Sequence, residues 1–163
     1  FNILGPLTNP AGPRCQVLGV ARPDLGEKMA LALDRLGCER AFVVHGGDGA
    51  DELTLSADNQ IWELNDHKVK NFTLSANEVG LTVRPPGSMK GGDAETNRTL
   101  MEAVLGGEPG PLFDAVAFNA GAVLFVANQA SDVQAGVKQA KDILSTGEPW
   151  KRMLLFAEFT QGL

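Results

Sequence analysis

A glycine-rich segment with acidic residues is the first place in the sequence where chemistry could occur. It spans residues 46–52 and reads GGDGADE. Glycines let the backbone turn sharply and approach a ligand closely. The adjacent carboxylates of Asp51 and Glu52 can offer oxygen ligands to Mg²⁺, which binds few protein carboxylates together with water and phosphates. The spacing alone leaves two interpretations open: a metal site, or a glycine-rich turn with solvated acids.

Two further segments combine glycine with residues that restrict the chain. Residues 5–10 (GPLTNP) form a stiff loop that could be a wall against a flat ligand, or only a structural connection. Residues 91–93 (GGD) precede a predicted helix, whose N-terminus could hold a phosphate. The Asp93 carboxylate would occupy the same N–H groups. We therefore expect Asp93 to cap the helix.

Two single polar residues lie where the surroundings are apolar. His45 ends a predicted strand beside the acidic segment, and its pKa near neutrality would suit a general acid or base. A structural role is the commoner one for such a histidine, and we favour it. Asn119 lies in the middle of an apolar helix, where we expect it to form buried hydrogen bonds. We assign no catalytic residue in this chain.

The elements that must position these residues begin with alternating strands and helices. Residues 16–20 and 40–45 predict two β-strands with a helix at 23–37 between them, which makes a βαβ unit. The acidic segment then follows the carboxyl end of the second strand, where ligands bind in open α/β sheets. Residues 53–74 predict an antiparallel meander that starts with a strand-like segment at 53–55.

From residue 93 onward the pattern predicts four successive helices. The last is expected to begin at Pro149 and to turn Met153, Leu154 and Ala157 inward. The predicted fold class is therefore α/β, with a mixed, mainly parallel sheet, an antiparallel meander and flanking helices.

Composition excludes several classes of function. The chain has 163 residues, 44% of them hydrophobic and 21% charged, and its net charge is −6. Its basic residues are scattered, whereas a nucleic-acid surface needs them clustered. No apolar run reaches the roughly 20 residues of a membrane span. Two cysteines predict reduced thiols and a cytoplasmic location. We expect no nucleic acid and no membrane as partners.

Five motifs, in order along the chain, together resemble the anthranilate phosphoribosyltransferase family. They are FNILGPLTNP, QVLGV, VVHGGDGADELT, GGDAETN and DAVAFNAGAVLFVA. The resemblance implies transfer of the phosphoribosyl group of phosphoribosyl pyrophosphate (PRPP) to the amine of anthranilate, with Mg²⁺, in tryptophan biosynthesis. It implies a fold with a small helical domain and a larger α/β domain, and an active site at the hinge between them.

The resemblance also assigns roles to individual residues. The acidic pair of the family's DGxDE motif falls on Asp51 and Glu52, which would hold one Mg²⁺. The GP of its GPLTNP motif falls on Gly5 and Pro6, which would line the anthranilate site. Anthranilate and PRPP would be the small-molecule substrates. A homodimer of the full-length protein is the assembly that the resemblance suggests.

Only the second half of the family's chain is covered by this resemblance. Residues 1–163 would form part of the α/β domain. The helical domain and the PRPP-binding loop GTGGD would fall outside the chain. Phe1 opens an apolar segment without a preceding Met, so we expect further residues before it in the natural protein. We also expect the fragment alone to be inactive.

Two other functions stay open on the residues alone. A pyrimidine nucleoside phosphorylase would share the fold, although the GPLTNP and DGxDE motifs favour the anthranilate enzyme. A non-catalytic relative that binds nucleic acid would be expected to carry a basic surface, which this acidic chain lacks.

Overall fold

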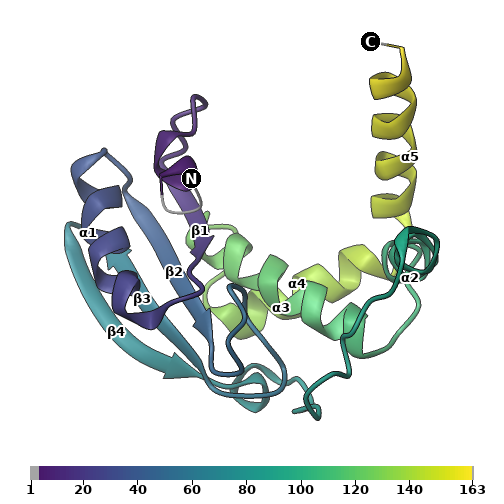
Figure 1. Ribbon diagram of the computed structural model, residues 1–163, viewed down its shortest axis with the longest axis horizontal. Coiled ribbons are helices and arrows are strands. Elements are labelled where there is room, and N and C mark those ends of the chain that lie inside the picture. The colour runs from purple at the N-terminus through teal and green to yellow at the C-terminus, as the bar shows by residue number, and fades with distance from the viewer. Residues whose placement is uncertain (1–3, 163) are drawn as a thin grey trace.

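The computed structural model describes residues 4–162 (Figure 1). Phe1 to Ile3 lie outside the described part, and so does Leu163. The expectation that further residues precede Phe1 therefore falls outside the described residues. In chain order the 3₁₀-helices (η), strands and α-helices are η1 (Gly5–Thr8), β1 (Cys15–Gly19), η2 (Pro23–Leu25), α1 (Gly26–Arg35), β2 (Arg40–Gly46), β3 (Asn59–Asn65), β4 (Lys68–Leu74), η3 (Ala76–Val79), α2 (Ala94–Leu105), α3 (Pro111–Val126), α4 (Val133–Leu144) and α5 (Glu148–Gln161).

Four strands form one mixed sheet in the order β1-β2-β3-β4. β1 and β2 are parallel and joined through α1, so the predicted βαβ unit is confirmed. β3 pairs antiparallel with β2 and with β4, which confirms the last two strands of the predicted meander. The sheet is less parallel than predicted, because only one of its three described pairings is parallel. Antiparallel neighbours need only a short turn, here Asp66-His67, whereas each parallel pair requires a crossover.

The central strand β2 is buried on both faces of the sheet. On one face Val43 packs in a cluster with Met29 and Leu33 of α1. On the other face Phe42 packs in a cluster with Phe118 of α3 and with residues of α4. Figure 1 shows this layering, with α1 on one side of the sheet and α3 and α4 on the other. The apolar run of β2 follows from this position, because a strand covered on both faces has no polar side.

Helices α3 and α4 touch through their backbones. A Cβ atom placed on Gly121 of α3 would lie 2.5 Å from the backbone nitrogen of Val137, and one on Gly136 of α4 would lie 2.3 Å from the carbonyl oxygen of Gly121. Neither position has room for a side chain, so the two helices approach each other closely at these glycines. Although α3 is largely apolar, none of the helices in residues 4–162 has both the length and the apolar character that crossing a bilayer requires.

The last helix differs from its prediction. α5 begins at Glu148, as expected near Pro149, but none of its residues is buried. Leu154 is 47% exposed, and Met153 and Ala157 are only partly covered. Figure 1 shows α5 extending away from the sheet, beside α2. The spacing of apolar residues identified one side of this helix, but the described part of the chain provides no core for that side to enter.

Candidate functional site

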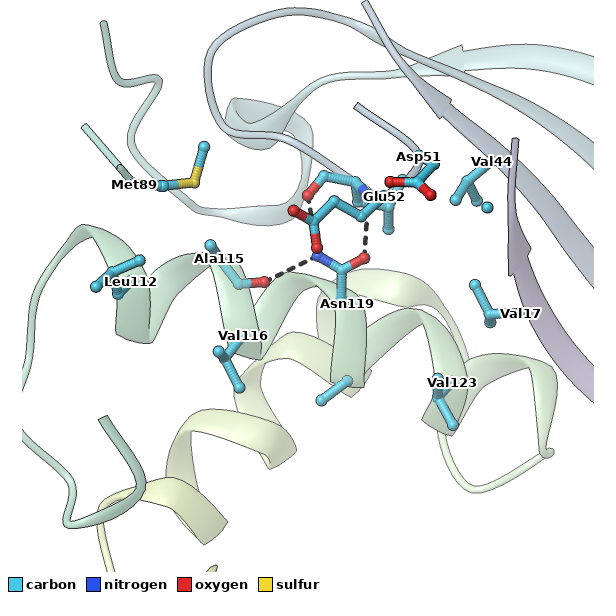
Figure 2. A pocket seen from close by; sticks show the side chains of 13 residues that line it. Val17, Val44, Asp51, Glu52, Met89, Leu112, Ala115, Val116, Asn119 and Val123 are labelled. Atoms are coloured by element: carbon cyan, nitrogen blue, oxygen red, sulfur yellow. Dashed lines mark hydrogen bonds between the residues drawn. The ribbon is translucent and has the colours of Figure 1, made fainter. Parts of the chain in front are cut away.

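The predicted acidic pair lies at a hollow of about 530 Å³ between the sheet and α3 (Figure 2). The carboxyl ends of β1 and β2 form one side, and α3 forms the floor. Asp51 and Glu52 lie on the loop that follows β2. The apolar lining comes from both layers: Val17, Val44, Leu53, Met89, Leu112, Ala115, Val116, Ala120 and Val123. The structure thus places the pair at a strand's carboxyl end, as the sequence predicted.

Close backbone contact fixes the loop against β1. A Cβ atom on Gly19, the last residue of β1, would lie 1.6 Å from the carbonyl oxygen of Asp51. Only a residue without a side chain lets the loop approach this closely. In Figure 2 the Asp51 carboxylate lies on the side of Val44, whereas that of Glu52 lies above α3 near Asn119. The two carboxylates therefore enter the hollow from one loop but in different directions.

Asn119 holds the residue that follows the pair. Its side-chain oxygen accepts from the backbone N–H of Leu53 at 3.0 Å, and its side-chain nitrogen donates to the Leu53 carbonyl at 2.9 Å. The same nitrogen donates to the carbonyl of Ala115, one turn earlier in α3. The expected hydrogen-bonding role of Asn119 is confirmed, although the side chain is half-buried and also lines the hollow.

Four residues that the sequence reasoning missed keep this loop in shape. Asp48 accepts from the hydroxyls of Thr54, at 2.7 Å, and Ser56. Asn59, which is 0% exposed, accepts from the N–H of Thr54 and donates to its carbonyl. These bonds replace the strand predicted at 53–55, where the structure has a buried but irregular segment. An Asp that is followed at short range by Thr, Ser and Asn was the available signal, since such side chains commonly bond nearby backbone.

Hydrogen bonds keep the Asp48 carboxylate in its charged form. Partial burial alone would raise the pKa of Asp48. The hydroxyls of Ser56 and Thr54 and the N–H of Ala50 outweigh this effect, so that the pKa lies below its usual range. Hydrogen bonds donated to a carboxylate favour its ionised form. Asp48 is thus an anion whose bonding capacity is used inside the loop.

Asp51 and Glu52 differ from Asp48 in their contacts. Both are exposed, and their carboxylates make no hydrogen bond to another described residue. No group of three or more His, Cys, Asp or Glu side chains suited to a metal occurs within residues 4–162. Two free carboxylates are too few for a site built from protein ligands alone. They do fit Mg²⁺, which takes one or two carboxylates and completes its shell with water and substrate phosphates.

Gly5 and Pro6, the other predicted pair, lie at a second hollow of about 490 Å³. They belong to η1, and residues 16–19 of β1 line the same hollow. Val17 and Gly19 line both hollows, so the end of β1 separates the two predicted parts of the site. The structure therefore places GPLTNP and the acidic pair on the two sides of one strand.

The remaining candidates have structural contacts. His45 bonds through Nδ1 to the carbonyl oxygen of Val20 at 2.8 Å, which matches the structural role that we favoured. Asp93 accepts from the N–H of Thr96 and caps α2, as expected. Neither residue lines the hollow beside the acidic pair.

Comparison with known protein families agrees with this architecture. Residues 1–149 match the model of a glycosyl transferase family, α/β domain. The chain belongs to this family. The match covers the sheet, both hollows and helices α1 to α4, so all the predicted site residues lie within the family domain.

Similar curated proteins carry one name. A Synechococcus sp. (strain CC9311) protein named anthranilate phosphoribosyltransferase is 46% identical over 163 residues, which are 99% of this chain and 47% of that protein. One of the same name from Trichlorobacter lovleyi is 47% identical over 147 residues, or 90% and 42% of the two chains. The resemblance read from the motifs is confirmed. The chain spans about half the length of these relatives.

Solved structures show the same correspondence. Anthranilate phosphoribosyltransferase from Thermus thermophilus superposes with a TM-score of 0.89 at 42% identity, over 98% of this chain and 47% of that one. The α/β fold class is confirmed by this match. The enzyme from Saccharomyces cerevisiae, solved in complex with PRPP and Mg, has a TM-score of 0.84 at 24% identity, over 98% and 46% of the chains, and shows likeness of fold.

Proposed function

We propose that this chain is part of an enzyme that transfers the phosphoribosyl group of PRPP to anthranilate. The products would be N-(5-phosphoribosyl)anthranilate and pyrophosphate, in cytoplasmic tryptophan biosynthesis. The observation that carries this proposal is the match to the Thermus thermophilus enzyme, which extends over nearly the whole chain in sequence and in fold. The placing of the acidic pair and GPLTNP on two sides of β1 supports it, because a transfer enzyme must hold two substrates next to each other.

Asp51 and Glu52 are the residues that we propose for Mg²⁺. Their exposed carboxylates make no bonds to other described residues and face a hollow large enough for substrate phosphates. Bound Mg²⁺ would neutralise the negative charge that develops on the leaving pyrophosphate. Asp51 and Glu52 would hold and orient this Mg²⁺. Asn119 keeps the backbone next to them in place through its hydrogen bonds to Leu53.

Gly5 and Pro6 are proposed to line the anthranilate site. The η1 turn and β1 form a shallow wall without charged side chains, which suits an aromatic ring. The amine of anthranilate is already a nucleophile, so positioning contributes more than proton removal. No general base is therefore assigned to this chain.

The chain is proposed to be part of the α/β domain, with the helical domain and the PRPP loop supplied by the rest of the protein. The coverage of about 47% of the similar enzymes supports this division. The 163 residues alone should then not catalyse the reaction, and a homodimer would depend on the full-length protein. Purified fragment that consumed anthranilate in a fluorescence assay would contradict this division.

The decisive experiment replaces Asp51→Asn together with Glu52→Gln in the full-length protein. Removing both anionic ligands should raise the Mg²⁺ concentration needed for half-maximal activity by about tenfold or more. The measurement is anthranilate consumption across a Mg²⁺ titration at saturating PRPP. Asp58→Asn is the matched control, because this exposed Asp is near the same loop and does not line the hollow. An unchanged Mg²⁺ dependence in the double variant would contradict the metal role.

A further inference from the structure

The acidic loop contains a third carboxylate whose contacts differ from those of the pair. Asp48 lies three residues before Asp51 and bonds residues on the far side of the pair. Its Oδ2 accepts from Thr54 Oγ1 at 2.7 Å and from the Ser56 hydroxyl, and its Oδ1 accepts from the N–H of Ala50 at 3.2 Å. Asp48 therefore joins the two ends of the segment in which the pair lies.

Backbone bonds close the same loop from inside. The N–H of Gly46 donates to the carbonyl of Ala50 and the N–H of Gly49 to that of Gly46, both at 2.8 Å. Gly49 has a φ of +96°, a value that favours glycine, so the shape of this turn depends on glycine at that position. At the other end, the N–H of Gly47 donates to the carbonyl of Asp58 at 3.1 Å. The loop is thus shaped before any ligand binds.

We infer that Asp48 is a positioning residue that fixes the loop backbone from which Asp51 and Glu52 would reach the metal. This inference rests on the proposed metal role of the pair. Both Asp48 oxygens already accept hydrogen bonds from the protein, whereas those of Asp51 and Glu52 make none to the described residues. A group that fixes metal ligands without binding the metal lowers the ordering cost of binding. The lowered pKa of Asp48 agrees, since the anion persists at neutral pH.

The test compares Asp48→Asn with Asp58→Asn in the full-length protein, using Mn²⁺ as a spectroscopic probe. Binding of Mn²⁺ in the presence of PRPP is followed by electron paramagnetic resonance. Asp48→Asn should raise the Mn²⁺ dissociation constant about tenfold, because an amide cannot replace the carboxylate toward all three donors. At saturating Mg²⁺ most of the wild-type kcat should return, since the ligands themselves remain. Asp58→Asn should bind Mn²⁺ as the wild type does.

Two results would overturn the inference. Unchanged Mn²⁺ affinity in Asp48→Asn would mean that the loop keeps its shape without the carboxylate. Loss of binding equal to that of the Asp51→Asn, Glu52→Gln double variant, with no recovery at any metal concentration, would mean that Asp48 is itself a ligand. If Asp48→Asn fails to fold, Ser56→Ala decides, because it removes one donor only. It should weaken Mn²⁺ binding by a smaller factor, and an unchanged affinity would overturn the inference.

The Asp51→Asn, Glu52→Gln protein distinguishes this inference from the proposed function. If that protein binds Mn²⁺ normally, the metal role and the inference both fail. If it loses Mn²⁺ while Asp48→Asn and Ser56→Ala do not, only the positioning role fails.

Discussion

The acidic loop between β2 and β3 and the helix α5 are held in opposite ways. The loop has no regular secondary structure, yet Leu55 is 0% and Thr54 1% exposed, and side-chain and backbone bonds fasten both its ends. α5 is a regular helix, yet Phe156 and Phe159 are 61% and 66% exposed. Regular backbone geometry therefore does not indicate how firmly a segment is attached. Burial and satisfied polar groups do, and here they belong to the segment that carries the candidate site.

Among the substitutions that test how the loop is held, the largest effect is expected from Gly19→Ala, which would separate the loop from β1. The new methyl group would lie 1.6 Å from the Asp51 carbonyl oxygen, so strand or loop must move. We expect a loss in the free energy of unfolding at the upper end of the range for overpacking, about 3 kcal/mol. Urea unfolding of the full-length protein measures it.

A matched control for Gly19→Ala is Gly110→Ala. Position 110 has no atom within 4 Å of an added Cβ, and its φ of 171° suits any residue. A loss for Gly19→Ala no larger than that of the control would show that the loop is not seated as tightly as the contact implies.

A smaller effect is expected from Asn59→Ala, which opens the loop from its buried side. The substitution removes the acceptor for the N–H of Thr54 and the donor to the carbonyls of Thr54 and Leu74. Leaving such buried groups unpaired should cost about 2 kcal/mol. Faster hydrogen exchange at the Thr54 amide would locate the loss in the loop. Asn71→Ala, on the exposed strand β4, serves as control, and equal stability losses would contradict the prediction.

The smallest effect is expected from Phe156→Ser in a purified sample of these 163 residues. With 61% of the side chain exposed, little apolar burial is lost, and the change in the free energy of unfolding should stay within about 0.5 kcal/mol. Phe118→Ala, a fully buried aromatic on α3, is the contrasting variant and should cost about 4 kcal/mol. Comparable losses for the two variants would mean that α5 is packed after all.

The sequence predicted those parts of the site that local chemistry determines. Glycines before two acids at the end of a β-rich run placed Asp51 and Glu52 at a strand's carboxyl end, and Asn119 stood out as polar within an apolar helix. Asp48 was overlooked because its partners depend on how residues 54–59 turn back. The segment 53–55 looked strand-like because Leu53 and Leu55 are apolar, but both are buried in the core cluster shared with β2, α3 and α4 without forming a strand.

Neighbours distant in sequence explain the other errors. The spacing of apolar residues along α5 identified an apolar side, but a local pattern does not show whether another element covers that side. The proportion of parallel pairing also depends on which strands are adjacent, and hydrophobicity alone does not give that order. The closeness of Gly19 to Asp51 could not be read either, because it joins two segments that meet only in the folded sheet.

The glycine contact between α3 and α4 has a consequence for how this protein can vary. Gly121 and Gly136 meet backbone to backbone, and Gly121 lies two residues beyond Asn119, which holds the acidic loop. A side chain gained on α4 at position 136 would displace α3 and with it the floor beneath Asp51 and Glu52. Positions 121 and 136 therefore cannot be varied independently of each other. A mutational library that randomises α4 can shift the floor of the site without altering any residue that lines it.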